Sequence, residues 1–264
     1  MEPIDYGISR LSIVPIRSKG SDASEMISQL LFGEHYAVLE LSKNKQWLRI
    51  QNAFDSYEGW IDAKQHYRIS QEYFEQINNS EYKICTDLTS QILYGKSVIH
   101  ITLGAVLPIL NNSLFMDQER FAFNGEAKSI HQRWSVDLTL ELAKKYLNSP
   151  YLWGGTTPFG IDCSGFTQMV LRVAGYRLPR DSKDQITKGK EITFENIMPG
   201  DLAFFTNKEG KMNHEGLVLS PTEVIHASGK VRIDKLDDQG IFSVEQNNYS
   251  HHLFKIKRIL RDYT

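Results

Sequence analysis

The sequence predicts an α+β protein, in which small β-barrels precede a domain of helices and antiparallel strands. The first ~130 residues contain short apolar or alternating segments separated by Ser, Gly, Asn and Asp, a pattern typical of short-stranded barrels. From Asp137 onwards, segments with helical periodicity come first and strand-like segments follow. This order of elements is that of an α+β domain.

Two barrels fit the first part of the chain. Gly33 and Gly104 each precede an apolar strand-like segment, which suggests an internal repeat. A rival alignment of residues 29–33 with residues 91–95 fits about as well, so the repeat stays a hypothesis. The strands expected in the first barrel are residues 6–14, 36–41, 47–51 and 59–61, and those in the second are residues 82–86, 97–103, 106–110 and 120–123.

The second part of the chain begins with a helix predicted over residues 138–147, with Asp137 near its N-terminal cap. A polar, glycine-rich stretch runs through Gly160 to a second helix that begins near Cys163. The strands that follow are expected at residues 202–205, 216–219, 224–226 and 254–258.

The composition is that of an ordinary soluble globular protein. The 264 residues are 41% hydrophobic and 23% charged, with a formal net charge of −2, which gives no electrostatic footprint for nucleic acid or for an anionic membrane. No apolar run approaches the ~18 residues of a membrane-spanning helix. The acidic, proline-broken start, residues 1–6, is unlike a signal peptide, so we expect a cytoplasmic protein. A periplasmic or secreted protein whose leader had been removed would begin in the same way.

Cys163 stands where the second helix begins. The exposed N–H groups of a first helical turn favour a sulfur anion, so we expect a pKa below the usual value of about 8.5. A buried, inert cysteine is the alternative, and it is the interpretation that we prefer for Cys85, within the strand predicted over residues 82–86. A bridge between the two cysteines stays open, although two cysteines do not make a disulfide framework. The apolar stripe of this helix is Phe166, Met169, Val170, Val173 and Ala174, with Asp162 or Ser164 as the cap and Gly175 as the C-terminal stop.

A thiolate nucleophile needs a partner base, and the strands supply His214 and His226. If a turn at residues 220–222 pairs Leu219 with Glu223, His226 lies opposite Gly216 and His214 is its diagonal neighbour, about 7–8 Å away between β-carbons. One imidazole then orients the other. A slip of one residue would place one of them on the opposite face. We expect ordinary surface or core positions for His35, His66, His100, His131, His251 and His252.

The same cysteine and two histidines could also hold a catalytic zinc ion with a bound water. A closed structural zinc site needs a fourth ligand, which the sequence does not offer.

Five motifs in a fixed order make residues 137–264 resemble an NlpC-type cell-wall cysteine peptidase. The resemblance implies a papain-like α+β domain that needs no cofactor and no metal. Cys163 would be the nucleophile, His214 the base and His226 the group that orients the base. The motifs are residues 151–155, residues 162–166, residues 180–185, residues 199–202, and the pair His214 and His226.

The front half is similar to a subgroup with two bacterial SH3-like domains before the peptidase. The resemblance implies SH3-like domains at residues 1–70 and 80–128 and the peptidase at residues 137–264. Such enzymes, of the dipeptidyl-peptidase VI type, cleave γ-D-glutamyl-L-diamino-acid bonds in muropeptides with a free L-Ala amine. The matching residues are 24–26, 29–34, Trp47 and 57–61.

The resemblance also implies substrate-binding residues. Glu25 would bind the substrate ammonium through a charge-assisted hydrogen bond, and Tyr57 would help to wall the pocket. A solvated acid and a barrel-core aromatic are the alternatives for these two. Trp47 and Trp60 are expected in the barrel core. The remaining roles are Tyr151 at the oxyanion, Trp153 packed on the substrate, and Asp162, Ser164, Asp181 and Ser182 as hydrogen-bonding groups for its L-Ala-γ-D-Glu part.

Gly154 and Gly155 are expected to form a tight turn, since no Lys-Ser or Lys-Thr pair follows to make a phosphate loop.

Glu215 departs from the family pattern, in which an apolar residue follows the base. We expect that if Glu215 points into the sheet, the register drawn above is wrong, and that if it points to solvent, the base is unaffected. Asn213 is also polar, so the strand is expected to begin as late as Gly216.

The sequence therefore predicts a cysteine endopeptidase that acts on a small muropeptide and binds no nucleic acid. The alternatives are an amidase or acyltransferase on the same core, a wall-binding module with an inactive catalytic domain, and a metal hydrolase. No motif distinguishes meso-diaminopimelate from L-lysine on the leaving side, and none indicates the oligomeric state.

Overall fold

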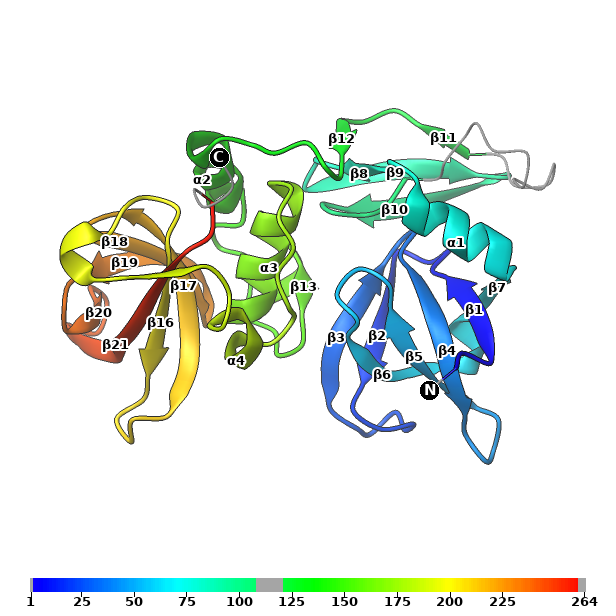
Figure 1. Cartoon of the computed structure of the whole chain (residues 1–264), viewed down its shortest axis with the longest axis horizontal. Coiled ribbons are helices and arrows are strands. Elements are labelled where there is room, and N and C mark those ends of the chain that lie inside the picture. Colours follow the sequence, from blue (N-terminus) through cyan, green and yellow to red (C-terminus); the bar gives the residue numbers. More distant parts are fainter. Residues whose placement is uncertain (1, 108–120, 261–264) are drawn as a thin grey trace. The chain divides into compact units, whose positions relative to one another are not determined.

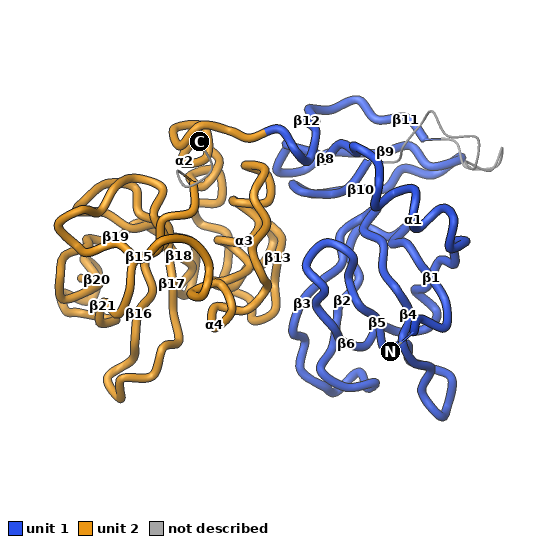
Figure 2. Tube along the Cα trace, viewed as in Figure 1, with its two compact units in different colours: residues 1–132 blue, residues 133–264 orange. Residues whose placement is uncertain are grey.

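The computed structural model describes residues 2–107 and 121–260. The chain divides into two compact units, Met1–Gln132 and Arg133–Thr264, which Figure 2 shows in different colours. This boundary lies close to the start that the sequence predicts for the second domain.

The first unit contains a seven-stranded antiparallel sheet in the order β3-β2-β6-β5-β4-β1-β7 (Figure 1). Alternate residues of its strands bury one apolar core, which includes Ile16, Leu30, Tyr36 and Ile50. Trp47 is buried as expected, at 7% exposure, whereas Trp60 is half-buried. The strands are β1 Asp5–Ile8, β2 Ile13–Arg17, β3 Met26–Leu31, β4 His35–Leu41, β5 Trp47–Asn52, β6 Glu58–Asp62 and β7 Tyr67–Ile69, with a 3₁₀ turn, η1, at Ala63–Gln65.

A helix that the sequence analysis missed, α1 (Gln71–Asn79), follows the sheet; the Ser70 hydroxyl caps it by accepting from the amide of Tyr73. Beyond it lie a three-stranded sheet, β10-β9-β11, and a two-stranded pair, β12-β8. A second core gathers around Phe32, Cys85 and Ile101, so Cys85 is a core residue, as predicted. These strands are β8 Lys83–Cys85, β9 Thr89–Tyr94, β10 Ser97–Thr102, β11 Phe121–Phe123 and β12 Ala127–Ser129.

The strand expected at residues 106–110 lies partly outside the described residues. Within them, Val106 makes a single antiparallel bridge to Ile84. That this region is a second SH3-like domain stays a prediction.

The second unit begins with helices. Helix α2 (Val136–Lys145) is capped by the Ser135 side chain, two residues before Asp137, which lies in the first turn near the cap, as predicted. Helix α3 (Cys163–Val173) begins where it was predicted, with Asp162 as its cap. It stops at Gly175, whose positive φ of 91° suits glycine. The remaining short elements are β13 Thr156–Thr157, β14 Gly160–Ile161, α4 Ser182–Gln185 and the 3₁₀ turn η2 at Phe194–Asn196.

The strands of the second unit form a closed antiparallel barrel (Figure 1). The order is β15-β21-β16-β17-β18-β19-β20, and a further pairing of β20 with β21 closes the ring. Phe205, Val218, Val224 and Ile256 fill its interior. The strands are β15 Lys190–Ile192, β16 Leu202–Thr206, β17 Met212–Ser220, β18 Glu223–Ser228, β19 Lys230–Leu236, β20 Gly240–Ser243 and β21 Asn248–Arg258.

The four predicted strands are present, and β15, β19 and β20 were missed. Strand β17 begins at Met212, so the prediction that it begins at Gly216 is wrong.

Glycines let the loop before α3 lie directly against the first turn of that helix. A β-carbon on Gly155 would be 2.3 Å from the carbonyl oxygen of Gly160, and one on Gly165 would be 2.3 Å from that of Gly155. Gly154 has a positive φ of 75°, as the predicted tight turn requires. The loop therefore holds the helix start without any side chain between the two backbones.

Among the described residues, none of the helices has the length and apolar character needed to cross a bilayer.

Replacing Gly165 by Ala tests this close packing. An Ala in place of a helical glycine ordinarily stabilises a helix by about 1 kcal/mol. Here the added methyl group meets backbone, so we expect Gly165→Ala to lower the free energy of unfolding by about 1–3 kcal/mol. Calorimetry of the full chain measures the change. Lys145→Ala, on the exposed side of α2, is the control and should change stability by less than about 0.5 kcal/mol. A more stable Gly165→Ala protein would contradict the packing argument.

Candidate active site

Cys163 is the first residue of α3 and is 6% exposed. The helix starts here because Asp162, in an extended conformation, accepts a hydrogen bond from the amide of Gly165 at 2.7 Å. The sulfur therefore lies at the positive end of the helix, as the sequence predicts.

The carboxylate of Asp162 connects the loops around the start of α3 through hydrogen bonds. It also accepts from the amide of Gly154 at 2.8 Å and from both terminal nitrogens of Arg180, at 2.7 and 3.0 Å. Asp162 and Arg180 are 4% and 2% exposed. Internal donors therefore surround the carboxylate of Asp162, and its predicted role as a substrate-binding residue stays a prediction.

Ser164 is likewise engaged within the domain. Its hydroxyl accepts a hydrogen bond from the Arg180 guanidinium at 2.9 Å, and its backbone carbonyl oxygen accepts one from the side-chain amide of Gln185 at 2.9 Å. The residue is 7% exposed, and its contact to substrate stays a prediction.

The ionisation expected of Cys163 is wrong for the resting structure. Burial, and then the nearby carboxyl groups of Glu215 and Asp162, raise the pKa of its thiol to about 12, although hydrogen bonds from Ser182 and Ser164 oppose the change. Desolvation and like charge therefore outweigh the helix terminus. Cys163 is a protonated thiol until a partner takes its proton.

His214 and His226 are directly hydrogen-bonded. Nε2 of His214 lies 2.7 Å from Nδ1 of His226, and the two side chains are 5% and 1% exposed. The predicted pairing of Gly216 with His226 is correct. The pairing of Leu219 with Glu223 is wrong, because Glu223 pairs with Ser220 and the register shifts by one residue after Val218. This bulge lies beyond the histidines and leaves their shared face unchanged.

Asp234, which the sequence analysis missed, completes a relay of three residues. It lies on β19, one diagonal step from His226, and its Oδ2 is 3.1 Å from Nε2 of His226. Although burial raises the pKa of Asp234, hydrogen bonds from His226 and Arg232 hold it below its usual value.

The relay assigns the ring hydrogens. An ionised carboxylate only accepts, so Nε2 of His226 carries a hydrogen and Nδ1 of the neutral ring accepts from Nε2 of His214. Nδ1 of His214 then carries no hydrogen, so it is the ring nitrogen that can accept a proton from a thiol.

His251 is a further residue that its sequence position did not indicate. From β21 it stacks on His214, with ring centroids 4.3 Å apart and planes at 23°. Burial, with the neighbouring His226 and His251, lowers the pKa of His214 well below its usual value. Burial also lowers the pKa of His251, to about 4. Burial therefore favours the neutral forms of His214 and His251.

Glu215 points into the core between β17 and the helices and is fully buried, at 0% exposure. Its Oε1 lies 2.6 Å from the Thr167 hydroxyl, one helical turn after Cys163. The expectation that a buried Glu215 would overturn the strand register is wrong. Neighbouring strand residues face opposite sides, so Glu215 faces α3 while His214 faces His226.

Two aromatic residues lie just upstream of the nucleophile and remain accessible. Tyr151 is 37% exposed and Trp153 is 59% exposed. Burial and then the negative charges of Cys163 and Asp162 raise the pKa of Tyr151 to about 12, so its hydroxyl is a proton donor within electrostatic reach of the sulfur. Asp181 caps α4 without a side-chain hydrogen bond to it, and both Asp181 and Ser182 are half-buried.

Glu25 and Tyr57 lie in the first unit, where Glu25 is exposed and Tyr57 is half-buried. The structure thus leaves the Glu25 carboxylate at the surface, and its role towards a substrate stays a prediction, as does that of Tyr57.

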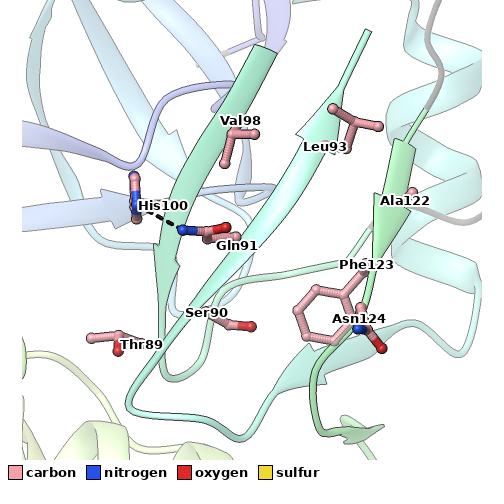
Figure 3. A pocket seen from close by; sticks show the side chains of 9 residues that line it. All are labelled: Thr89, Ser90, Gln91, Leu93, Val98, His100, Ala122, Phe123 and Asn124. Carbon is pink, nitrogen blue, oxygen red and sulfur yellow. Dashed lines mark hydrogen bonds between the residues drawn. The ribbon is translucent and has the colours of Figure 1, made fainter. Parts of the chain in front are cut away.

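Two other features, a possible metal site and a surface hollow, give little support to a different functional site. Within residues 2–107 and 121–260, His, Cys, Asp and Glu form no group of three or more that could hold a metal ion, so the zinc hypothesis gains no support. Figure 3 shows a hollow on the sheet of β9, β10 and β11, where Gln91 is hydrogen-bonded to His100 at 3.1 Å. Among the described residues that line it there is no cysteine, aspartate or glutamate, although Thr89 and Ser90 supply hydroxyl groups.

Comparison with known families identifies the class of protein. Residues 148–256 match the NlpC/P60 family, and residues 16–65 match the bacterial dipeptidyl-peptidase SH3 domain. The chain therefore contains an NlpC/P60 domain, the domain of a family of peptidoglycan peptidases, together with a bacterial dipeptidyl-peptidase SH3 domain.

Two curated relatives and one solved structure show which proteins the chain is similar to. The chain is 28% identical over 219 residues to the γ-D-glutamyl-L-lysine dipeptidyl-peptidase of Bacillus subtilis, covering 76% of this chain and 71% of that one. It is 27% identical over 251 residues to dipeptidyl-peptidase 6 of Lysinibacillus sphaericus, covering 82% and 86%. An NlpC/P60 family protein from Bacillus cereus has the same fold, with a TM-score of 0.80 at 20% identity over 97% of this chain and 99% of that one.

Arg180→Met tests whether Asp162 is a structural anchor. The change leaves a buried carboxylate without its counter-charge, so we expect unfolding free energy to fall by about 3–5 kcal/mol. Adding Asp162→Asn should restore part of the loss. Urea titration measures both.

Lys183→Met provides the matched control, because Lys183 forms an exposed pair with Asp181 at 3.4 Å. It should cost less than about 1 kcal/mol. If Arg180→Met were equally mild, and Asp162→Asn altered substrate KM alone, Asp162 would be a substrate-binding residue after all.

Proposed function

We propose that this protein is a cysteine endopeptidase that hydrolyses the γ-D-glutamyl-L-diamino-acid bond of peptides derived from peptidoglycan. The relay from His214 through His226 to Asp234 is the observation that carries the proposal, because it leaves one basic nitrogen on a buried, oriented imidazole. Cys163 begins the helix that packs on the strand of that imidazole through Thr167 and Glu215.

In the proposed reaction, Nδ1 of His214 takes the Cys163 thiol proton as the sulfur attacks the γ-glutamyl carbonyl carbon. The tetrahedral intermediate collapses as the C–N bond breaks and His214 returns the proton to the departing amine. Water then attacks the thioester, losing a proton to His214, and the C–S bond breaks to restore the thiol. The amide of Cys163 and the Tyr151 hydroxyl would hold the oxyanion.

The protonation states fit this sequence of steps. A neutral thiol beside a neutral imidazole stores no buried charge at rest, and proton transfer creates the thiolate and imidazolium together. His226 and Asp234 then stabilise the imidazolium, as the carboxylate does in a Ser-His-Asp triad.

The SH3 domain and the names of the relatives, γ-D-glutamyl-L-lysine dipeptidyl-peptidase and dipeptidyl-peptidase 6, support the choice of substrate. We propose that Glu25 pairs with the free ammonium of an N-terminal L-Ala and that Tyr57 lies beside it. Trp153, Asp181 and Ser182 would contact the L-Ala-γ-D-Glu part, since Trp153 is exposed and the other two are half-buried. A longer peptide, in which that amine is acylated, would leave the carboxylate unpaired and bind poorly.

Cys163→Ala tests the reaction. Cleavage of L-Ala-γ-D-Glu-L-Lys, followed by mass spectrometry of the products, should fall by at least about a thousandfold, because the nucleophile is lost. Cys85→Ala, in the core of the first unit, is the control and should retain activity. Substantial turnover by Cys163→Ala would end the proposal, and products joined to an added amine would indicate an acyltransferase.

Acetylating the substrate amine tests the role of Glu25. We expect kcat/KM to fall about a hundredfold or more on the blocked peptide, because a charge-assisted hydrogen bond is lost and the carboxylate is left unpaired. Glu25→Gln should lower the rate on the free peptide and add little on the blocked one. Glu72→Gln, an exposed acid in the first turn of α1, serves as the control. Equal rates on both peptides would remove Glu25 from the site.

A further inference from the structure

Glu215 is a buried ionisable group that the proposed reaction does not use. It is 0% exposed and lies on the face of β17 opposite His214, against the first turns of α3. Its Oε1 is 2.6 Å from Oγ1 of Thr167, while Oε2 is buried without a hydrogen-bond partner among the described residues. A fully ionised carboxylate in such a place would be costly.

Counting hydrogens at Thr167 indicates which form Glu215 takes. The amide nitrogen of Gln185 donates to the carbonyl oxygens of Ser164 and Pro179, at 2.9 and 3.0 Å, so the Gln185 oxygen faces Thr167 as an acceptor. That oxygen lies 2.9 Å from the Thr167 hydroxyl. The hydroxyl has one hydrogen, yet it stands between two side-chain acceptors if Glu215 is ionised.

If Glu215 carries a proton, there is one hydrogen for each of the two contacts of the Thr167 hydroxyl. The carboxylic acid donates to Thr167, and Thr167 donates to Gln185, so both short contacts become hydrogen bonds. The carbonyl oxygens of Ser164 and Cys163, at 3.1 and 3.4 Å from the same hydroxyl, offer no further hydrogen. The contacts around Thr167 are therefore satisfied only when Glu215 is neutral.

The charged groups around Glu215 agree with this form. Asp162 and Cys163 approach it from the start of α3, and Arg180 lies in the segment before α4, already bound to Asp162 at 2.7 Å. Burial, with the charge of Asp162, raises the pKa of Glu215 to about 8, although the hydrogen bonds of Thr167 and Ser182 and the charge of Arg180 oppose the change. On β16, the residue paired with Glu215 is the apolar Phe204.

The charge of Glu215 also affects the ionisation of Cys163. After burial, the charge of Glu215 is the next largest cause of the raised Cys163 pKa. A negative charge on Glu215 therefore opposes a negative charge on the sulfur, as for two acids that share one site.

We propose that Glu215 is a positioning residue that must stay a neutral acid for Cys163 to form its thiolate, so that ionisation of Glu215 limits activity at alkaline pH. This inference rests on the proposed role of Cys163 as the nucleophile. The carboxylic acid holds the first turns of α3 through Thr167 and Gln185, and releasing its proton to solvent both breaks that chain and adds charge beneath the sulfur.

Glu215→Gln tests the proposal, because a Gln amide can donate to Thr167 as the acid does and never ionises. Alkylation of Cys163 by iodoacetamide, followed peptide by peptide from pH 6 to pH 10, needs no substrate. Above about pH 8, where wild-type Glu215 ionises, we expect Cys163 to be alkylated about tenfold faster in Glu215→Gln than in wild type, which corresponds to about one unit in the pKa of Cys163. The wild-type kcat/KM should decline above about pH 8, where Glu215 ionises, whereas Glu215→Gln should keep its plateau to higher pH.

Stability provides a readout that does not involve catalysis. The unfolded chain loses the Glu215 proton near pH 4.5 and the folded chain retains it to about pH 8, so folding of the wild type weakens between these values relative to Glu215→Gln. The difference in urea midpoint between Glu215→Gln and wild type should therefore grow from pH 5 to pH 8 and then level. A glutamate that is ionised throughout would give a constant difference.

Glu209→Gln, at an exposed site in the loop before β17, is the control and should leave all three profiles unchanged. Superimposable alkylation and stability profiles for wild type and Glu215→Gln would overturn the proposal. If Glu215→Gln does not fold, a carbon-13 titration of wild-type glutamate carboxyls decides, because a resonance titrating near pH 8 supports the proposal and none above pH 6 refutes it. An active Cys163→Ala protein would instead refute the proposed function, whatever these profiles show.

Discussion

The carboxylate of Asp162 is the interaction on which the catalytic unit depends. It joins three segments by accepting from Gly154 in the loop before α3, from Gly165 inside the helix, and from Arg180 before α4. A buried ion pair of this kind gains little net stability, because removing both charges from water costs about as much as their attraction returns. Its contribution is geometric, since it fixes where α3 begins and hence where the sulfur of Cys163 lies.

Exclusion of water decides the protonation states of the site. Burial raises the pKa of the thiol and lowers that of His214, so both are neutral at rest. The His214–His226–Asp234 relay stabilises a positive imidazole only when a proton arrives. Glu215 acts in the same sense, because a carboxylic acid in a dry core supplies a hydrogen bond without a charge. Cys163, His214 and Glu215 are therefore neutral until proton transfer in the reaction creates charge.

Local patterns in the sequence were sufficient to predict helix α3 and the pairing of the two strands that carry the histidines. The apolar stripe after Cys163, its Asp162 cap and the glycine stop predicted α3, because each acts within one helical turn. The pairing of Gly216 with His226 followed from a short turn and the two-residue period of strands. The bulge at Leu219 breaks that period without any local signal. The start of β17 was misplaced because Asn213 and Glu215 are polar, and polarity is a poor guide where a hydrogen bond allows burial.

The sequence alone determined the family and indicated Cys163 and the pair of imidazoles as the candidate site, since motifs in a fixed order carry that information. The tertiary structure alone decided which groups surround them. Asp234 and His251 reach the relay from β19 and β21, Arg180 meets Asp162 across 18 residues, and Thr167 meets Glu215 across 48. Burial is a property of the closed barrel and of the helix packed on it, and ionisation follows burial. Residue types and spacings can therefore predict which side chains take part, whereas their charge depends on the folded core around them.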